Sequence, residues 1–571
     1  MINMSYKDKI WKKSWDSYVK DLDPKEFDMT YPQAIRRTME EFPEKMAFDY
    51  LGVTFTYKDL DEASSQFANM LIENGFKKGD VVGINLPNTP EYLMGIIGTL
   101  KAGCIVSGVS PLLSDIQMQY QLNDLGSGGN KVAVLTLDAI FAGRLTKIAS
   151  KIPQLKLAIA TSVGGYLPKI KQVLGKLIGK IPKGKITPLE GVTVMDFHKD
   201  MLTTYSKELP KADFKPDDLA FIQYTGGTTG LPKGAMLTHK NIVSDIVIFQ
   251  KWLNWERGKG VALSGFPFFH IAGTFTTLNV IYLSWSQVLI PNPRDSDHII
   301  KEMAKYEPSV LANVPSLYQI LMKNPKFKEL DHSKLDFCVS AAAPFPEVSQ
   351  RELEAIVGKG KLIEAYGMTE TSPLTASNPS VGVKKLGSIG LPLNNEEFKL
   401  VDPNTGSEVP LGEAGEICVK GPQVMVGYFN KPEETKKAID KDGFMHTGDV
   451  GLMDEDGYVK IVDRTKDMII VGGFKVFSAK LEDTLVKHPA IGMVATIGVD
   501  NPERPGSEIV KAIIQLDPDY SYDGNEEALK KDITAFAKEN CSPYEVPKII
   551  EITEELPLTT VGKVDKKSLR K

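Results

Sequence analysis

Strand-like and helix-like segments alternate along the chain between residues 45 and 300. The stretch "GDVVGINL" (79–86) is typical of a buried strand. The next stretch, "NTPEYLMGIIGTLKAG" (88–103), is typical of a helix, with a polar start, Pro90 in its first turn and Gly103 at its far end. Another strand pattern, "NKVAVLTLD" (130–138), follows. This order and spacing predict an α/β fold built on a largely parallel sheet.

The pattern changes after about residue 380, where short strand-like segments such as "GEICVKG" and "DGYVKIVD" are separated by glycine turns. The C-terminal part then combines two further strand patterns with an amphipathic helix at 526–540. We therefore expect a large N-terminal domain, residues 1–465, made of parallel-sheet α/β subdomains and a β-rich subdomain. A small α+β domain, residues 466–571, is expected to be hinged on the large one.

The composition argues against several classes of protein. The 571 residues include 68 Lys and Arg against 73 Asp and Glu, so the formal net charge of −5 gives no global attraction to nucleic acid. The cysteines lie far apart and form no CxxC or Cys/His motif, so neither a disulfide framework nor a zinc site is expected. The N-terminus lacks the apolar region of a secretory signal. The uncharged stretch 266–293 is long enough to span a bilayer, but its polar residues favour a buried core segment. We expect a cytoplasmic protein.

One glycine-rich stretch points to phosphate binding. "YTGGTTGLPKGAMLTH" (224–239) directly follows an apolar strand pattern. In such a turn the backbone N–H groups can converge on an anion, and the threonine hydroxyls and Lys233 add donors and charge. The Walker A pattern needs Lys directly after Gly with a hydroxyl next, whereas Lys233 stands between Pro232 and Gly234. A polyphosphate loop of another type is therefore favoured over a Walker NTPase or a plain surface turn.

Five further motifs follow in a fixed order: "FPFFHIAG" (266–273), "EAYGMTE" (364–370), "HTGDVG" (446–451), "DRTKDMIIVGGFKV" (463–476) and "PLTTVGKVDKKSLR" (557–570). Together with the glycine-rich loop they resemble the adenylate-forming superfamily of acyl-CoA synthetases, firefly-type luciferases and peptide synthetase adenylation domains. The resemblance covers nearly the whole chain and is strongest to bacterial long-chain fatty acid–CoA ligases. It implies that ATP and a carboxylic acid give an acyl-adenylate and pyrophosphate, after which the thiol of coenzyme A displaces AMP.

The resemblance also implies which residues handle the phosphates. Glu370 would bind Mg²⁺ with help from Thr225, and Thr369 would contact the α-phosphate or the acid's carboxylate. Many relatives have Ser where Gly226 stands, which removes one hydroxyl donor but is not expected to remove activity. The residues expected around the β- and γ-phosphates are Thr225, Gly226, Gly227, Thr228, Thr229, Gly230 and Lys233.

The nucleoside side of the site is implied in the same way. Tyr366 would stack on adenine, and Asp449 could accept both ribose hydroxyls through its two oxygens. Arg464 would assist on the ribose side, and Ile461 would pack near the base. The remaining expected nucleotide-binding residues are Ala342, Glu364, Ala365, Gly367 and Met368.

Four more residues are implied to act on the acid or in the domain movement. His270 would face the acid's carboxylate, and Lys563 would bring a cation to the α-phosphate in the first half-reaction. The C-terminal domain would then swing about Lys466, and Gly473 would mark the point where pantetheine passes. A side chain at Gly473 would block that passage.

The acid itself is expected to be apolar. Ala341, Ala342 and Ala343 leave room beyond the carboxylate, and no charged residue is evident to pair with an amino acid's ammonium. A medium- or long-chain fatty acid is therefore favoured. Aryl or alicyclic acids, delivery to an acyl carrier protein, a luciferase-like oxygenase and a binder without chemistry stay as alternatives. The sequence does not fix the oligomeric state, and a homodimer stays open.

Residues 166–185, "YLPKIKQVLGKLIGKIPKGK", form a basic amphipathic stretch. They include six lysines and no acid, and apolar residues recur at helical spacing from Ile170 to Ile181. One interpretation is an ordinary surface helix with a solvated basic face. The other is a peripheral, reversible contact with the inner face of the cytoplasmic membrane.

Overall fold

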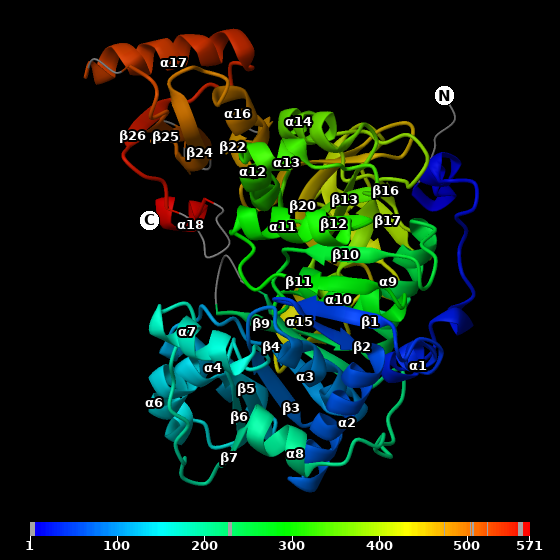
Figure 1. The fold of residues 1–571 in the computed structure, drawn as a ribbon. Coiled ribbons are helices and arrows are strands. Elements are labelled where there is room, and N and C mark those ends of the chain that lie inside the picture. The colour runs from blue at the N-terminus through cyan, green and yellow to red at the C-terminus, as the bar shows by residue number, and fades with distance from the viewer. Residues whose placement is uncertain are drawn as a thin grey trace.

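The computed structural model describes residues 6–225, 231–472, 474–502, 504, 507–521, 524–557 and 564–570 (Figure 1). Among these residues, no helix has both the length and the apolar composition needed to cross a bilayer. The long uncharged stretch around residues 266–293 instead forms α10 (Ile271–Tyr282) and β11 (Ser286–Leu289), and both are largely buried, as expected from the sequence.

The first large sheet confirms the predicted alternation. Its strands lie in the order β19-β9-β8-β4-β3-β5-β6-β7, and the pairs from β8 to β7 are parallel. The helix α3 (Pro90–Lys101) follows β3 and ends just before Gly103, whose φ is 71°. The strands are β3 (Val81–Asn85), β4 (Ile105–Gly108), β5 (Val132–Leu137), β6 (Leu155–Thr161), β7 (Thr193–Asp196), β8 (Leu219–Thr225), β9 (Lys233–Thr238) and β19 (Gly427–Tyr428).

A second large sheet has the order β16-β15-β14-β13-β12-β10-β11-β1-β2 and is parallel through its central strands. These strands are β1 (Met46–Tyr50), β2 (Val53–Thr56), β10 (Val261–Ser264), β11, β12 (Val310–Asn313), β13 (Phe337–Ser340), β14 (Leu362–Gly367), β15 (Leu374–Ser377) and β16 (Leu391–Pro392).

One layer of helices packs against both large sheets. Residues of the two sheets and of these helices form a single hydrophobic core. The layer contains α1 (Tyr31–Glu41), α2 (Tyr57–Glu73), α3, α9 (His239–Trp252) and α10.

The chain beyond residue 395 is rich in antiparallel strands, as predicted. One sheet has the order β17-β18-β20-β21, with β17 (Glu397–Val401), β18 (Ala414–Lys420), β20 (Met445–Met453) and β21 (Val459–Arg464). The smaller C-terminal part then forms its own cores, and it lies at the top of Figure 1. It contains β22 (Ile469–Val471), β23 (Phe474–Val476), α16 (Ser478–Leu485), β24 (Ile491–Asp500), β25 (Glu508–Leu516), α17 (Glu526–Asn540), β26 (Ile549–Thr553) and α18 (Lys566–Leu569).

The basic amphipathic stretch 166–185 is helical over only part of its length. The helix α7 (Lys169–Leu177) ends where Gly179 adopts a φ of 73°, a left-handed value that glycine accepts readily. Ile181, expected to continue the apolar stripe, instead folds back and is buried against Gly164 and Gly175. The predicted stripe therefore stops at Ile178.

Candidate active site

Three parallel strands bring polar side chains to one edge of the second sheet. Asn313 ends β12, Ser340 ends β13, and these two residues and Glu364 of β14 pair in adjacent register. All three are buried, yet Asn313 Nδ2 and Ser340 Oγ have no hydrogen-bond partner among the described residues. Buried polar groups are nearly always paired, and ligands of α/β folds bind at the carboxyl ends of strands. This edge therefore suits a ligand with its own polar groups.

Backbone strain marks the turn just after β13. Ala342 has a φ of 68°, in the left-handed region that residues with a Cβ rarely adopt, and it is exposed at this edge. Nearby, burial raises the pKa of Glu364 to about 8 although the Gln350 amide donates a hydrogen bond to its carboxyl group. Glu364 is therefore largely protonated at neutral pH. Gln350 gave no signal in the sequence, because α14 (Glu347–Val357), which carries it, reads as an ordinary surface helix.

A charged cluster, here called the Asp449 cluster, joins β14 to the β20–β21 hairpin. The Tyr366 hydroxyl donates to Asp449 Oδ2 at 2.7 Å, and Arg464 Nε donates to Asp449 Oδ1 at 2.9 Å. Both carboxylate oxygens thus accept a hydrogen bond, and each keeps a second lone pair for another donor. The structure brings together three residues that the sequence motifs had suggested separately. Ile461 lies on β21, beside this cluster, and is half-buried against the main core.

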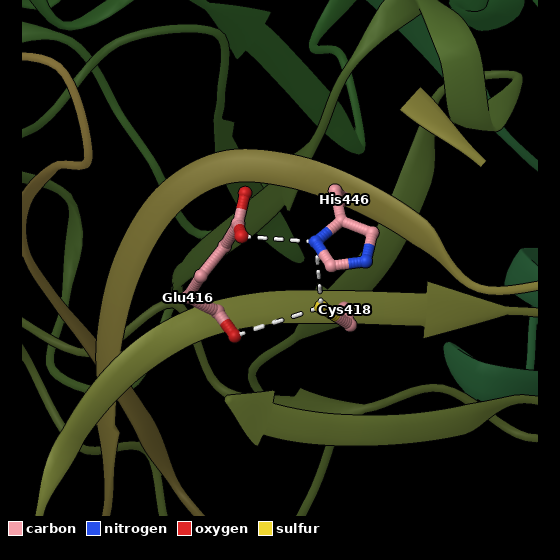
Figure 2. Close-up of side chains that lie close together, drawn as sticks. All are labelled: Glu416, Cys418 and His446. Carbon is pink, nitrogen blue, oxygen red and sulfur yellow. Dashed lines mark hydrogen bonds and ion pairs between the residues drawn. The ribbon is translucent and has the colours of Figure 1, made fainter. Parts of the chain in front are cut away.

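The strand segment that carries Asp449 is fixed by a second acid. Glu416 accepts from Gly448 N at 3.0 Å through Oε1, and its Oε2 lies 2.9 Å from His446 Nδ1 (Figure 2). The hydrogen bond that the His446 ring donates to Glu416 raises the pKa of His446. Glu416 thereby positions the residues just before Asp449. The sequence identified "GEICVKG" only as a strand.

Cys418 completes this group, with its Sγ 3.5 Å from His446 Nδ1 (Figure 2). In the described part of the chain, one group of three His, Cys, Asp or Glu side chains has ligand atoms close enough to hold a metal ion. It consists of Glu416, Cys418 and His446. The sequence showed no Cys/His motif because the two residues lie 28 positions apart and meet across β18 and β20. Burial raises the pKa of the Cys418 thiol, and the imidazole is already bonded to Glu416, so hydrogen bonding accounts for the cluster.

The strands on either side of the glycine-rich loop hold a second set of charges. Thr225 at the end of β8 pairs with Lys233 at the start of β9. Lys233 Nζ lies 3.2 Å from Glu434 and 4.4 Å from the centre of the Tyr428 ring. The Tyr428 hydroxyl in turn donates to Glu370 Oε1 at 2.6 Å. Tyr428 and Glu434 had no signal in the sequence motifs.

Glu370 is buried within the short turn η7 (Thr369–Thr371), and this burial raises its pKa, whereas the Tyr428 hydroxyl and the Lys233 charge act in the opposite direction. Thr369 is buried in the same turn, and Ala365 is buried in β14. Gly367 cannot carry a side chain here, because a Cβ would lie 1.7 Å from the Pro373 carbonyl oxygen. The Met368 N–H donates to that same carbonyl at 2.8 Å. The Glu370 carboxylate offers the oxygen ligands that Mg²⁺ prefers.

The loop before α10 is held by two residues. The Asn88 side chain accepts from Phe268 N at 2.8 Å and donates to Phe266 O at 2.9 Å. The Gln223 amide of β8 donates to Phe269 O, which links this loop to the glycine-rich region. His270 caps α10 and accepts from Ala272 N through Nδ1. A neutral ring in this arrangement carries its proton on Nε2. Asn88 lies in the polar start predicted for α3, but its role was not foreseen.

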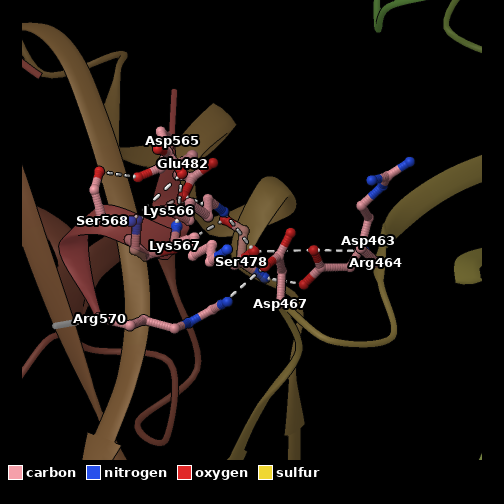
Figure 3. Close-up of polar contacts among 11 residues, drawn as sticks. Asp463, Arg464, Asp467, Ser478, Glu482, Asp565, Lys566, Lys567, Ser568 and Arg570 are labelled. Atoms are coloured by element: carbon pink, nitrogen blue, oxygen red, sulfur yellow. Dashed lines mark hydrogen bonds and ion pairs between the residues drawn. The ribbon is translucent and has the colours of Figure 1, made fainter. Parts of the chain in front are cut away.

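Seven of the predicted site residues lie outside the described residues: Gly226, Gly227, Thr228, Thr229, Gly230, Gly473 and Lys563. The residues that flank Lys563 on its C-terminal side are anchored, however. Lys566 Nζ lies 2.7 Å from both Ser478 Oγ and Glu482 Oε1, and Arg570 lies 2.9 Å from Asp467 (Figure 3).

Lys466 lies between β21, the last strand of the four-stranded antiparallel sheet, and β22, the first strand of the C-terminal part. Partial burial and the Arg464 charge lower the pKa of Lys466 to about 8. Across the same junction, Asp463 accepts from the Ser478 hydroxyl at 2.9 Å, and Lys475 pairs with Asp402 at 2.8 Å.

Comparison with known proteins identifies the family of this chain. Residues 35–429 match the AMP-binding enzyme family, and residues 480–563 match the AMP-binding enzyme C-terminal domain. The chain is 35% identical to a long-chain-fatty-acid–CoA ligase of Escherichia coli over 98% of each chain. It is 36% identical to one of Bacillus subtilis over 92% of each chain. The crystal structure of the anthranilate CoA ligase AuaEII with anthranoyl-AMP is 25% identical, with a TM-score of 0.81 over 96% of this chain and 98% of that one. The chain therefore belongs to the AMP-binding enzyme family and is an AMP-forming acyl-CoA synthetase.

Proposed function

We propose that this enzyme is a ligase for medium- and long-chain fatty acids, and that it works through an acyl-adenylate and then a CoA thioester. The observation that carries the nucleotide part is the edge formed by Asn313, Ser340 and the Asp449 cluster. Buried polar atoms without a hydrogen-bond partner in the described part of the chain lie there on the same sheet as Tyr366, which donates to a carboxylate with spare lone pairs. A base and a ribose supply the donors and acceptors that such groups need. ATP and CoA use follow from the family.

In the first step the chain has to offset the charge of a carboxylate next to a triphosphate. Lys233 would turn from Glu434 to the phosphates, and Lys563 would approach the α-phosphate. Glu370 and Thr225 would hold Mg²⁺, which supplies Lewis-acid stabilisation of the phosphate oxygens when bound. The Tyr428 hydroxyl fixes one oxygen of Glu370 and leaves the other for this role.

His270 is the residue we assign to the acid. Its Nδ1 is engaged with Ala272 N, so the neutral ring presents an Nε2–H donor to a carboxylate oxygen. This donor would orient the acid for attack on the α-phosphate. The acid attacks through its oxygen and pyrophosphate leaves; in the second step the CoA sulfur attacks the acyl carbon and AMP leaves.

Two observations support a fatty acid as the substrate. The relatives of Escherichia coli and Bacillus subtilis, matched over nearly their full length, carry the name long-chain-fatty-acid–CoA ligase. The turn after β13 consists of Ala341, Ala342 and Ala343, whose small side chains leave space next to the site. An aryl acid is the second candidate, because AuaEII was solved with anthranoyl-AMP. Pyrophosphate release with a panel of fatty and aryl acids, with and without CoA, separates the two.

The two-step scheme with a swinging lid has its own test. Lys563→Ala should abolish adenylation but retain thioester formation from supplied acyl-adenylate, because this lysine serves only the first step. Gly473→Leu should retain pyrophosphate release but block CoA acylation, because a side chain would close the pantetheine path. If Lys563→Ala loses both half-reactions equally, or Gly473→Leu retains CoA turnover, the scheme is wrong.

A further inference from the structure

The helix α7 turns its apolar side chains outward. Between residues 170 and 178, five large apolar side chains are more than half exposed: Ile170 75%, Val173 58%, Leu174 54%, Leu177 71% and Ile178 65%. An α-helix advances about 100° per residue, so these five lie on one continuous stripe. Scattered exposed apolar residues are normal, but a contiguous group of this kind marks an interaction surface.

The opposite side of α7 is the one that faces the protein. The Gln172 amide donates to Gly165 O at 3.2 Å and to Leu167 O at 2.8 Å. Gly175 is so close to Ile181 that a Cβ would lie 2.6 Å from the Ile181 side chain. These contacts fix the rotation of the helix, so the apolar stripe faces solvent.

Lysines border the stripe. Lys169 and Lys171 flank it on the two sides of the helix, and the exposed Lys180, Lys183 and Lys185 follow beyond it. Residues 166–185 contain six lysines and no acid, in a chain with a net charge of −5. Lys176 differs from the others, because it is half-buried and interacts with the Asp138 carboxylate.

We propose that residues 166–185 dock the enzyme reversibly on an anionic phospholipid bilayer. An apolar stripe between lysines matches the boundary between acyl chains and charged headgroups, where the stripe enters the bilayer and the lysine ammonium groups stay at the phosphates. A second copy of the chain fits this face poorly, because a two-fold contact would place the lysines of both copies together.

The segment that carries the docking face connects through α3 to the loop that carries His270. Tyr166 contacts Met94 of α3 at 3.1 Å, and Tyr92 of the same helix packs on Phe268 with 5.6 Å between ring centres. A membrane contact would thus bring a substrate that is dissolved in the bilayer close to α3 and this loop. This benefit to the enzyme rests on the proposed fatty acid substrate, whereas the docking itself does not.

Vesicle co-sedimentation of the full-length protein tests the proposal. Vesicles with about 30% phosphatidylglycerol are compared with pure phosphatidylcholine vesicles at low and high salt. We expect binding to the anionic vesicles that falls with salt, and little binding to the neutral ones. Lys169→Glu/Lys171→Glu/Lys180→Glu should weaken binding about 100-fold. Ile170→Ser/Leu174→Ser/Leu177→Ser should weaken it at least about 10-fold.

Matched controls separate this surface from general charge and hydrophobicity. Lys301→Glu/Lys328→Glu/Lys359→Glu makes the same charge change on exposed lysines elsewhere, and Leu209→Ser/Val381→Ser/Val383→Ser removes other exposed apolar groups. Both controls should bind like the wild type. Absence of wild-type binding, equal losses in the controls, or self-association that the α7 serine variant abolishes without any vesicle binding would overturn the proposal. Activity on a water-soluble short-chain acid without vesicles, measured in parallel, tests the proposed function separately.

Discussion

The side chains of the Asp449 cluster pair with one another within the protein, whereas the apolar side chains of α7 face solvent. In the cluster, residues from β14, β20 and β21 converge, and each charged group is held by another. On α7 and its C-cap Ile178, five large apolar side chains face solvent next to lysines. The first arrangement pre-organises polar groups within the protein, as a site for polar chemistry needs. The second leaves its apolar and charged groups to a surface outside the molecule.

The largest effect is expected from Asp449→Asn. The change removes the charge that holds Arg464 and one acceptor for Tyr366, so nucleotide binding in the reactive geometry should suffer. We expect kcat/KM for ATP in pyrophosphate release to fall about 100-fold or more. Asp456→Asn, which alters an exposed pair with Lys385, is the control and should change it less than about two-fold. Similar values for both variants would remove Asp449 from the nucleotide site.

Glu370→Gln should have a smaller effect that depends on Mg²⁺. The amide keeps the shape and can still accept from Tyr428, but it lacks the negative charge that Mg²⁺ prefers. We expect the Mg²⁺ concentration for half-maximal activity to rise about 10-fold with a lower kcat. An unchanged Mg²⁺ titration would place the metal elsewhere.

Glu364→Gln should stabilise the protein, and only at higher pH. Burial raises the folded pKa of Glu364 to about 8, so between its unfolded value of 4.5 and pH 8 the folded state retains a proton that the unfolded state loses. The free energy of unfolding of the wild type therefore falls as pH rises through this window. The variant should be about 1–3 kcal/mol more stable than the wild type at pH 8.5 and nearly equal near pH 5. Glu329→Gln, at an exposed acid, is the control, and a gain that does not change with pH would contradict the account.

The smallest effect is expected on α7. Leu177→Ser should change the free energy of unfolding by less than about 0.5 kcal/mol, because this side chain packs on little of the protein. Ile181→Ala, four residues later, should cost about 2–4 kcal/mol because Ile181 is buried. Equal destabilisation in urea unfolding would mean that the outward stripe is part of the fold.

Periodicity in the sequence predicted the sheets well but predicted the extent of α7 wrongly. The strand–helix alternation from residue 79 to residue 138 and the start of α3 at Pro90 were confirmed, because they depend on local pattern and capping. The stripe of α7 stopped early because Gly179 breaks the helix and Ile181 finds a buried position, a tertiary choice that spacing does not contain.

The sequence motifs named residues that the structure brings into contact, but they did not reveal the residues that hold them in place. Tyr366, Asp449 and Arg464 converge as motifs of one site should, while their roles remain predictions. The missed residues act through contacts that join segments far apart in the sequence. Asn88 holds a loop 178 residues away, and Tyr428 holds Glu370 across 58 residues. Such residues carry no local signature, because an ordinary Asn or Tyr becomes a positioning residue only after folding.

Acyl-chain dependence tests the central claim most directly. With CoA, ATP and Mg²⁺ saturating, kcat/KM is measured for saturated acids from hexanoate to hexadecanoate and for benzoate and 4-coumarate. Each buried methylene can contribute about 0.8 kcal/mol, or roughly four-fold. The account predicts that kcat/KM rises at least about 10-fold from hexanoate to dodecanoate and that both aryl acids fall below hexanoate. A flat series, or an aryl acid as the best substrate, would contradict the assignment of a fatty acid–CoA ligase.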